Sequence, residues 1–570
     1  MNVFKATIED KRKKFNDEKY NYFMIHEIDL RTINFSSYEE LVDKFRWNVP
    51  EYFNIGEAIL DRNIREGFGD NIALYYEDEE GNKGVYSFSE IKKLSDAFIK
   101  VLKERFNVSK GAVIGVYLQP RPETIVSILS IYRLGGITLS ISPLMGTEAV
   151  EYRLRHSEAK VLVTDRKSVR ERIKNVNIVL VGEEARYENE MEFDEIKKEN
   201  ANFDAVKTKS EDPAQLFYTS GSTGAPKGVL HAHRFLLGHI PAYQLYFEMA
   251  PKDYDVFYTP ADWGWIGAIG DVILPSLYFG KPIVAYRREG KFNPRGHLAI
   301  MQKYKVTCSF IPPTALRMIR RDVEKPAKEY NLKLRAISSA GESVGEELIN
   351  WAMKELSPNA NEFYGCTEAN LVTVNNSMWR KVGSIGKPTP GHEVAVIDEN
   401  GNPVINQVGD IAVKIGDPVV FLGYFKNPEA TAKKFRGDWF LIGDLGIMDE
   451  SGYIWFKGRA DDVIKVSGYR LGPEEIERVI LQHPAVQDVA VIGKPDPLRG
   501  NIIKAFVVLK EGYSPSESLV NEIQQLVKER LAAYAYPREI EFVNELPRTE
   551  TGKLKRFELR RRENENAKSS

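Results

Sequence analysis

The stretch from Tyr218 to Gly228, YTSGSTGAPKG, has the residue types of a phosphate-binding loop. Seven of its eleven residues are Gly, Ser or Thr, and one lysine, Lys227, stands near its end. Few side chains block close approach to such a loop, so backbone N–H groups and hydroxyls can converge on an anion. The apolar run 214–217 favours a strand that leads into it. The pattern predicts a cradle for phosphate groups.

Two alternatives to this interpretation are a P-loop of a nucleoside triphosphatase and a flexible linker. The P-loop pattern Gly-x-x-x-x-Gly-Lys-Ser/Thr fails, because Pro226 takes the place of the second glycine and Gly228 follows Lys227. A Gly/Ser linker is disfavoured by Pro226 and Lys227 at the end of the stretch and by the strand-like sequence before it.

Three further stretches carry residues suited to nucleotide chemistry. NEFYGCTEA, residues 361–369, places Thr367 beside Glu368, and a carboxylate near phosphate needs a hard cation such as Mg²⁺ between them. GDWFLIGDLG contains Asp444, whose carboxylate can accept two hydroxyl donors at once. LPRTETGKLKR places Lys553 after a glycine. Each alone fits a helix cap, a turn or a surface residue, and it is their match, in order, to the motifs of a known family that indicates a site.

The loop closely resembles the signature loop of the adenylate-forming (AMP-binding) enzymes: acyl-CoA synthetases, luciferases and the adenylation domains of peptide synthetases. The resemblance spans residues 70–565. It implies that Glu368 helps to hold Mg²⁺, that Thr367 contacts phosphate, and that Lys553 is a catalytic cation that stabilises the transition state. Cys366, inside the second motif, is not assigned as a nucleophile. The residues implied in ATP binding are Thr219, Ser220, Gly221, Ser222, Thr223, Gly224, Lys227, Gly341, Glu342, Glu362, Phe363, Tyr364, Gly365, Cys366, Thr367, Asp444, Arg459, Arg470 and Lys553.

The same resemblance implies two half-reactions at one site. After the adenylate forms, the C-terminal domain would rotate about a hinge aspartate, Asp461, with Asp462 as the neighbouring alternative. The rotation would withdraw Lys553 and present another face to CoA. The residues implied in CoA binding are Ser467, Gly468, Tyr469 and Lys528.

Four positions that close the acyl pocket of short-chain acetyl-CoA synthetases differ here. By motif resemblance they are Ile266 and Gly267, after Trp265, together with Ala340 and Gly365. The short-chain enzymes have valine, threonine, valine and tryptophan, so three of the four residues are smaller here. Tyr-Gly in the metal motif also resembles the medium-chain acyl-CoA synthetases. The pocket is expected to extend beyond acetate or propionate, and the absence of charge at these positions disfavours amino acids.

Strands and helices must place these residues together. From residue 71 onward, apolar runs at 112–118, 137–142 and 160–164 alternate with helical patterns at 123–134 and 148–156. This alternation predicts a parallel sheet covered on both faces, with the loop at the carboxyl end of a strand. The runs 306–311 and 334–338 also lead into small or polar residues, which could face the same crevice.

The predicted fold is α/β: a large N-terminal domain of layered α/β sheets with a small β-rich subdomain, plus a small, mobile α+β C-terminal domain. The expected boundaries are 1–70 for an N-terminal extension, 71–460 for the large domain and 461–570 for the C-terminal domain. Turn signals at 398–401 and 448–452 place the β-rich part at about 382–456. Helices at 473–481 and 523–531 and strands at 486–492, 503–509 and 539–543 are expected in the last domain.

Composition excludes several classes of protein. The 570 residues are 43% hydrophobic and 28% charged, which is typical of a globular protein, and a net charge of −2 gives no general attraction for nucleic acid or anionic membrane. The first fifteen residues lack the apolar core of a secretory signal, and Arg133 and two glycines interrupt the most apolar stretch, 124–142. We therefore expect a cytoplasmic location and no membrane span. Two cysteines cannot build a disulfide framework.

The leading hypothesis is an AMP-forming acyl-CoA synthetase, an acid–thiol ligase that joins a short-to-medium-chain carboxylic acid, C4 or longer, to CoA at the expense of ATP. A hydroxy acid such as 4-hydroxybutyrate fits as readily as an unsubstituted acid. The alternatives are an enzyme that passes the acyl group to a carrier protein or to oxygen, an acetyl- or propionyl-CoA synthetase, and a non-catalytic nucleotide binder. Intact Lys227, Glu368, Asp444 and Lys553 disfavour the last. The expected partners are the acid, ATP and CoA, and an oligomer is left open.

Overall fold

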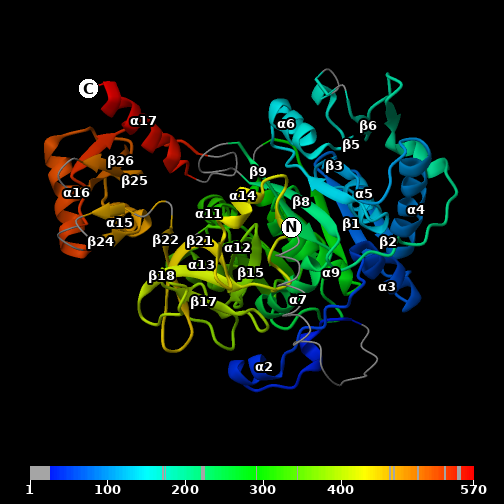
Figure 1. The fold of residues 1–570 in the computed structure, drawn as a ribbon, viewed down its shortest axis with the longest axis horizontal. Coiled ribbons are helices and arrows are strands. Elements are labelled where there is room, and N and C mark those ends of the chain that lie inside the picture. Colours follow the sequence, from blue (N-terminus) through cyan, green and yellow to red (C-terminus); the bar gives the residue numbers. More distant parts are fainter. Residues whose placement is uncertain are drawn as a thin grey trace. The chain divides into compact units, whose positions relative to one another are not determined.

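The computed structural model describes residues 26–169, 172–173, 175–219, 225–290, 292–342, 344–460, 462, 464–466, 469–496, 500–531, 535–548 and 554–569 (Figure 1). The side chains of 465–466, 469–470, 475, 500–501, 564 and 566–569 are not part of this description. Within these residues the chain forms two compact units. The first contains residues 26–219, 226–394 and 413–440, and the second contains 395–412 and 441–569.

A nine-stranded sheet in the first unit has the order β16–β15–β14–β13–β12–β10–β11–β1–β2. The six strands from β14 to β1 run parallel, whereas β2, β15 and β16 are antiparallel to their neighbours. The strands are β1 (Ile72–Asp78), β2 (Lys83–Ser87), β10 (Phe257–Tyr258), β11 (Ile283–Arg287), β12 (Cys308–Phe310), β13 (Ala336–Ser339), β14 (Ala360–Cys366), β15 (Ala369–Val374) and β16 (Lys387–Pro388).

An eight-stranded sheet in the same unit has the order β19–β9–β8–β4–β3–β5–β6–β7. Its strands are parallel from β8 to β7, and β9 and β19 form an antiparallel edge. The prediction of parallel α/β sheets is confirmed, with two sheets rather than one. The strands are β3 (Val113–Tyr117), β4 (Ile137–Ser140), β5 (Val161–Thr164), β6 (Asn177–Leu180), β7 (Glu190–Glu192), β8 (Pro213–Thr219), β9 (Lys227–Ala232) and β19 (Gly423–Tyr424).

Helices pack beside these strands for reasons visible in their sequences. Helix α4 begins with a capping box, in which the Ser87 side chain accepts from the Glu90 N–H and Glu90 reaches back to Ser87. Helix α5 begins with a proline, and eleven of its twelve residues are buried, so it lies inside the unit rather than on its surface. Helices α4 and α5 lie side by side (Figure 1).

The helical segments of the first unit, α4 and α5 included, complete its layers. They are η1 (Leu30–Thr32), α2 (Tyr38–Lys44), η2 (Glu57–Asp61), α3 (Arg62–Arg65), α4 (Phe88–Glu104), α5 (Pro122–Arg133), α6 (Thr147–Ser157), η3 (Lys167–Val169), η4 (Phe193–Lys198), α7 (Phe235–Tyr246), α8 (Ile266–Ala268), η5 (Ile269–Ile273), α9 (Leu274–Tyr278), α10 (Pro294–Lys303), α11 (Pro313–Asp322), α12 (Pro326–Glu329), α13 (Glu346–Glu355) and α14 (Pro428–Ala432).

Residues before the first sheet also contribute to the core of the first unit. Leu30, Leu41 and Leu60 have no exposed surface and belong to the same apolar cluster as strand residues such as Leu74 and Ile283. Burying each such side chain stabilises the fold by about 1.5–3 kcal/mol. Among the helices built from described residues, none combines the length and the apolarity that a membrane crossing requires.

A five-stranded sheet confirms the β-rich subdomain. Its order is β17–β18–β21–β20, with β22 paired to β21. The predicted turns are present, because the Gly401 N–H bonds to the Asp398 carbonyl and the Gly452 N–H to the Asp449 carbonyl. The strands are β17 (Val394–Ile397), β18 (Val408–Lys414), β20 (Phe435–Arg436), β21 (Trp439–Met448) and β22 (Ile454–Arg459).

The last part of the second unit is the small α+β domain expected from the sequence. Strand β26 pairs with β25 in an antiparallel and with β27 in a parallel arrangement, and Ile476, Val491 and Ile523 are fully buried in its core. The elements are β23 (Ile464–Val466), β24 (Tyr469–Leu471), α15 (Pro473–Ile480), β25 (Val486–Asp496), β26 (Gly500–Leu509), α16 (Glu517–Arg530), β27 (Glu539–Phe542) and α17 (Arg556–Ser569).

Candidate active site

The two ends of the predicted phosphate loop are held by a strand hairpin. Thr219, the last residue of β8, pairs in register with Lys227, the first residue of β9. The loop therefore begins at the carboxyl end of a parallel strand, where open α/β sheets bind ligands. The residues predicted to cradle phosphate between these ends, Ser220, Gly221, Ser222, Thr223 and Gly224, lie outside the described residues.

Lys227 and Glu368, predicted from separate motifs, lie on either side of one tyrosine. Strand β19 pairs with β9 and brings Tyr424 beside it, and the Lys227 Nζ lies 5.1 Å from the centroid of the Tyr424 ring. The Tyr424 hydroxyl donates a hydrogen bond of 2.6 Å to Oε1 of Glu368. The Phe421 N–H binds the Glu368 carbonyl at 2.9 Å. Tyr424 was not predicted as a site residue, because no local spacing connects it to either motif.

The turn that carries Thr367 and Glu368 is fixed from behind by a buried histidine. His231 on β9 has no exposed surface, and its Nε2 donates to the Thr367 carbonyl at 2.7 Å. Burial lowers the pKa of His231 to about 4, so the imidazole is neutral near pH 7. His231 was also missed by sequence reasoning, since a histidine in an apolar strand has no distinctive pattern.

The side chains of β14 alternate between the two faces of its sheet. Phe363 is 3% exposed and packs against Tyr246 and Phe310, with ring centroids 4.7 and 5.5 Å away. Its predicted contact with ATP would therefore fall to its backbone. Glu362 points to the other face, where burial raises its pKa to about 7 although the Val344 N–H binds it. Tyr364 shares that face with Glu362.

The predicted adenine-side residues follow β13. Gly341 has φ +89°, a left-handed conformation that favours glycine. Both carboxylate oxygens of Glu342 accept from the Thr314 hydroxyl, at 3.0 and 2.9 Å, and Arg317 forms an ion pair with it at 3.0 Å. Ala340, 8% exposed, comes directly after the last residue of β13. These contacts hold Glu342 against α11.

The positions predicted for the acyl pocket gather around the ends of β12, β13 and β14. A Cβ on Gly267 would lie 3.2 Å from the ring of Phe310, the last residue of β12. A Cβ on Gly365 would lie 2.6 Å from the Leu371 nitrogen and 2.7 Å from the Asn370 Cα. Gly365 is thus also required by the close approach of β15. Ile266 is 8% exposed, and Trp265 immediately precedes α8.

Asp444 and Arg459 are brought together in the second unit. They are register partners in the β21–β22 pair, and the Arg459 guanidinium donates to Oδ1 of Asp444 at 2.8 Å. The Asp444 side chain is 8% exposed. Both were predicted to contact ribose or phosphate, and their pairing places one cation and one carboxylate at the same end of this hairpin.

Several predictions for the C-terminal domain fall outside the described part of the chain. Lys553, Asp461, Ser467 and Gly468 belong to this group, and so do the side chains of Tyr469 and Arg470. Asp462, the alternative hinge residue, is described: Arg560 donates to it at 2.6 Å and Arg556 at 3.2 Å, both from α17. These bonds tie the residue beside the predicted hinge to the last helix.

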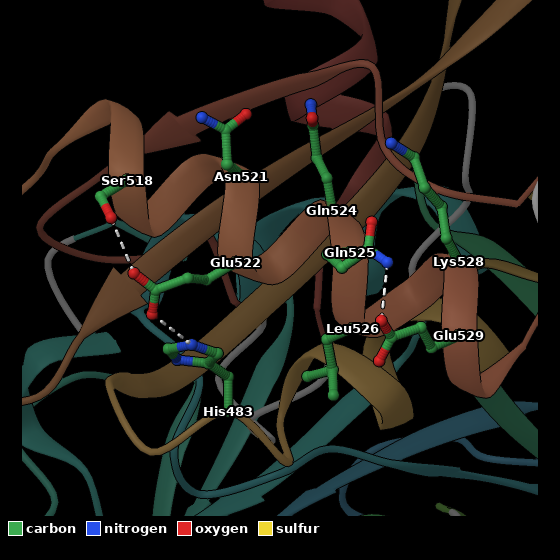
Figure 2. Close-up of a pocket in the computed structure, with 9 residues that line it drawn as sticks. All are labelled: His483, Ser518, Asn521, Glu522, Gln524, Gln525, Leu526, Lys528 and Glu529. Atoms are coloured by element: carbon green, nitrogen blue, oxygen red, sulfur yellow. Dashed lines mark hydrogen bonds and ion pairs between the residues drawn. The ribbon is translucent and has the colours of Figure 1, made fainter.

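Lys528, predicted to contact CoA phosphates, lines a shallow pocket along α16. Its Nζ lies 4.2 Å from the centroid of the Tyr536 ring. Figure 2 shows Lys528 at the opposite end of the pocket from the ion pair between His483 and Glu522, which measures 3.5 Å. The other lining residues are Ser518, Asn521, Gln524, Gln525, Leu526 and Glu529.

The donor set of the first unit fits a divalent cation only if phosphates complete it. The described residues contain no cluster of three His, Cys, Asp or Glu side chains suited to a metal. Glu368 has one oxygen bound by Tyr424, while no described residue binds the other. Mg²⁺ commonly uses one or two carboxylates together with waters and substrate phosphates. A single Glu368 beside a phosphate loop matches that chemistry.

Comparisons with known proteins agree with this arrangement. The AMP-binding enzyme family matches residues 60–425, and the AMP-binding enzyme C-terminal domain matches residues 475–553. Acetyl-coenzyme A synthetase of Bacillus subtilis (strain 168) is 35% identical over 549 residues, which cover 92% of this chain and 95% of that protein. Mitochondrial acyl-coenzyme A synthetase ACSM3 of Homo sapiens is 34% identical over 550 residues, 93% of each chain.

A solved structure extends the agreement to the fold. The anthranilate CoA ligase AuaEII, crystallised in complex with anthranoyl-AMP, superposes with a TM-score of 0.78 at 29% identity and covers 91% of this chain and 99% of its own. The large α/β domain, the β-rich subdomain and the small C-terminal domain are thus shared with relatives that span nearly the whole chain. The chain belongs to the AMP-binding, adenylate-forming enzyme family and is an AMP-forming acyl-CoA synthetase within it.

Proposed function

We propose that this enzyme activates a short-to-medium-chain carboxylic acid, C4 or longer, with hydroxy acids such as 4-hydroxybutyrate included. One observation carries the proposal: Gly267 leaves the ring of Phe310 without a neighbouring side chain from that position, and the small residues Ala340 and Gly365 stand at the ends of the adjacent strands β13 and β14. A pocket lined by small residues accepts a longer acyl chain, and each further buried methylene contributes roughly 0.8 kcal/mol.

The reaction divides into two balanced steps. First, a carboxylate oxygen of the acid attacks the α-phosphorus of ATP in line with the leaving pyrophosphate, giving the acyl-adenylate. Second, the thiol of CoA loses its proton to solvent, its sulfur attacks the acyl carbon, and AMP leaves with the electrons of the broken C–O bond. The relative crystallised with anthranoyl-AMP supports an adenylate intermediate in this family.

The chain's own residues would divide the work by charge. Lys227 and the loop it ends would neutralise phosphate charge, and Lys553 would stabilise charge at the α-phosphate in the first step. Glu368, steadied by Tyr424, would hold Mg²⁺, which supplies a compact charge beside the phosphates. Asp444 would accept from the ribose hydroxyls. Rotation about Asp461 would then bring the CoA-binding face, including Lys528, to the adenylate.

Acetate is the competing substrate that a specific observation favours. The Bacillus subtilis relative, at 35% identity, is an acetyl-coenzyme A synthetase, whereas the human relative at 34% carries the general name acyl-coenzyme A synthetase. Names at such similar identity do not rank acyl lengths. The small pocket residues favour the longer acids.

The decisive experiment measures CoA-dependent AMP release across C2 to C8 acids and 4-hydroxybutyrate. Gly267→Thr combined with Ala340→Val should shift the preference of the enzyme toward acetate and propionate, because added side-chain atoms would face Phe310. We expect kcat/KM to change about fourfold for each methylene of the acid, which corresponds to roughly 0.8 kcal/mol. Gly365→Trp is a poorer test, since any Cβ there meets the backbone of β15.

The outcomes separate the candidates. Preference of the wild type for acetate would overturn the acyl-length proposal and leave the reaction class untouched. AMP release that needs an acyl carrier protein instead of CoA would replace CoA as the acceptor. A matched control is Gly146→Ala, at an exposed glycine with φ −72° and no neighbour near its Cβ position, which should leave the ratio between acids unchanged.

A further inference from the structure

A chain of three polar side chains is buried directly behind the proposed acyl pocket. Asp271 in η5 is 2% exposed, His239 on α7 is fully buried, and Asn370 on β15 is 6% exposed. The Asn370 amide nitrogen lies 2.5 Å from Oδ1 of Asp271 and 3.3 Å from Nε2 of His239. The Asp271 side chain forms no ion pair with Lys or Arg among the described residues.

The hydrogen-bond directions along this chain follow from the acceptors at its ends. Nδ1 of His239 lies 2.6 Å from the Phe235 carbonyl, which can only accept, so Nδ1 carries the proton. Burial lowers the pKa of His239 to about 3, so its Nε2 is an acceptor. Asn370 therefore donates both amide hydrogens, one to His239 and one to Oδ1 of Asp271.

Asp271 is the last group of this hydrogen-bonded series, and its second carboxyl oxygen, Oδ2, is not used within the series. No lysine or arginine among the described residues forms an ion pair with this buried carboxyl group, and burial raises its pKa well above the ordinary range, which favours the protonated, uncharged form. Because Oδ1 accepts from Asn370, the proton resides on Oδ2. No residue that the structure describes forms a hydrogen bond with Oδ2. Oδ2 is not among the fully enclosed polar atoms that lack a partner, so it keeps a little accessible surface at which an acceptor from a ligand can meet it.

The position of Oδ2 indicates which acceptor that is. Oδ2 of Asp271 would lie 3.7 Å from a Cβ placed on Gly267. A Cβ placed on Gly365 would lie 2.7 Å from the Asn370 Cα. Gly267 and Gly365, two of the positions proposed to line the acyl pocket, therefore adjoin Asp271 and Asn370. The ring of Phe310, near Gly267, forms the apolar part of the same surface.

We propose that Asp271, positioned by Asn370 and His239, is a specificity-determining residue that donates a hydrogen bond to an oxygen carried on the acyl chain of the substrate. The enzyme then selects carboxylic acids with a hydroxyl or carbonyl group on the chain over isosteric acids without one. This inference rests on the proposed function, because it needs the acyl chain to pass Gly267. A site built to pair with a polar substrate group rejects the analogue that leaves the site group unpaired.

The test compares isosteric acids in pairs: 4-hydroxybutanoate with pentanoate, and 3-hydroxybutanoate with 3-methylbutanoate. The readout is the ratio of kcat/KM for CoA-dependent AMP release within each pair. Asp271→Leu should lower the ratio at least tenfold, by loss of the oxygenated acid rather than of both. Asp271→Asn should keep most of the preference, since an amide still donates toward the pocket and still accepts from Asn370.

Ser276→Ala is the matched control. Ser276 lies on α9, just after η5, is fully buried, and exchanges one hydrogen bond of 3.1 Å with Tyr243. Its removal deletes a buried polar group close to Asp271 in the sequence and should leave the ratio unchanged. An equal fall for both acids of a pair in Asp271→Leu and Asp271→Asn would mean a purely structural role and would overturn the proposal.

A second readout keeps the proposal testable if Asp271→Leu does not fold. The carbonyl stretching band of a protonated carboxyl group, identified by its loss in Asp271→Asn, should shift when 4-hydroxybutanoate binds and stay in place with pentanoate. An identical band with both acids would contradict the inference. If none of the tested acids supported AMP release, the proposed function would instead be contradicted. The binding spectra would still decide the role of Asp271.

Discussion

Two groups of buried carboxyl side chains are neutralised in opposite ways. In the first unit, Asp271 and Glu362 form no ion pair with Lys or Arg among the described residues, and burial raises the pKa of both. In the second unit, Asp462 and Glu477 accept from arginines of α17. In the first group burial favours the protonated form without opposition from a cation, whereas in the second group guanidinium groups oppose it, although burial still raises the pKa of Glu477. We call them the protonated acids and the arginine-bound acids.

The difference follows from what each region has to do. The Arg556 guanidinium lies 2.6 Å from Glu477 and 3.2 Å from Asp462, and Arg560 lies 2.6 Å from Asp462. These bonds fix the start of α17, three residues after Lys553. A protonated carboxyl group does less for rigidity, yet it offers a hydrogen-bond donor to a ligand. The first arrangement suits recognition, and the second suits positioning.

Glu474 shows that a nearby arginine does not by itself ensure ionisation. Burial raises its pKa to about 7 although Arg556 opposes the shift, because Glu477, Asp444 and Asp462 add negative charge around it. At Glu474, burial thus outweighs the nearby guanidinium of Arg556, and the neighbouring acids add to its effect.

The largest effect is expected from Arg556→Met. It would leave the arginine-bound acids with Arg560 as their main cation, and breaking a buried pair in this way costs about 3–5 kcal/mol. Urea unfolding of the variant should show this loss. Arg561→Met on the same helix is the control: its side chain is 69% exposed, and it should change stability by no more than about 0.5 kcal/mol. Equal stability of the two variants would contradict the distinction between the two groups.

The next effect concerns pH and the protonated acids. The pKa of Glu362 is 4.5 in the unfolded chain and about 7 in the fold. Between these values the unfolded chain loses its proton first, so the wild type loses stability as pH rises from 4.5 to 7 and then levels off. Glu362→Gln removes this pH-dependent loss of stability. The free energy of unfolding of the variant should exceed that of the wild type by about 3 kcal/mol at pH 7 and should not exceed it below pH 4.5.

The measurement is thermal or urea unfolding of both proteins from pH 4 to 8. The expected signature is a difference that opens with rising pH. Parallel profiles would show that Glu362 is ionised in the fold, and they would remove it from the protonated acids.

The smallest effect is expected at Glu368, whose carboxylate accepts one neutral hydrogen bond from Tyr424. Tyr424→Phe removes that bond and the orientation it gives. A single hydrogen bond is worth about 1 kcal/mol, so kcat/KM for AMP release should fall about fivefold. The Mg²⁺ concentration needed for half-maximal rate should rise with it. No change in either quantity would show that the carboxylate is positioned without Tyr424.

Much of the fold could be read from the sequence, because local pattern decides local structure. The alternation of runs such as 137–142 and helical segments such as 123–134 gave strand β4 and helix α5 within two residues of the expected bounds. Some strands are shorter than the apolar runs that predicted them: β12 begins at Cys308 rather than at Val306. The pattern did not reveal that the strands would divide between two sheets, since strand order depends on contacts distant in sequence.

The site was predictable as far as its motifs reach. Lys227 and Glu368 are recognisable by residue type and spacing, and they do come to one place. Tyr424 lies 56 positions from Glu368, and His231 lies 136 from Thr367, so only the folded sheets bring them together. The glycine at 365 also had an incomplete explanation, because the sequence suggested room for a ligand and not the close approach of β15.

The sequence by itself predicts the chemistry on offer: a phosphate loop, a metal-suited carboxylate, small pocket residues and a lysine proposed to be catalytic. The tertiary structure decided which groups meet and in what charge state. Asp271 and Asn370 are 99 positions apart, and the buried setting in which they pair raises the pKa of an otherwise ordinary aspartate. The physical reason is that solvation and hydrogen-bond partners set the proton's position, and both are properties of the packed fold rather than of the local chain.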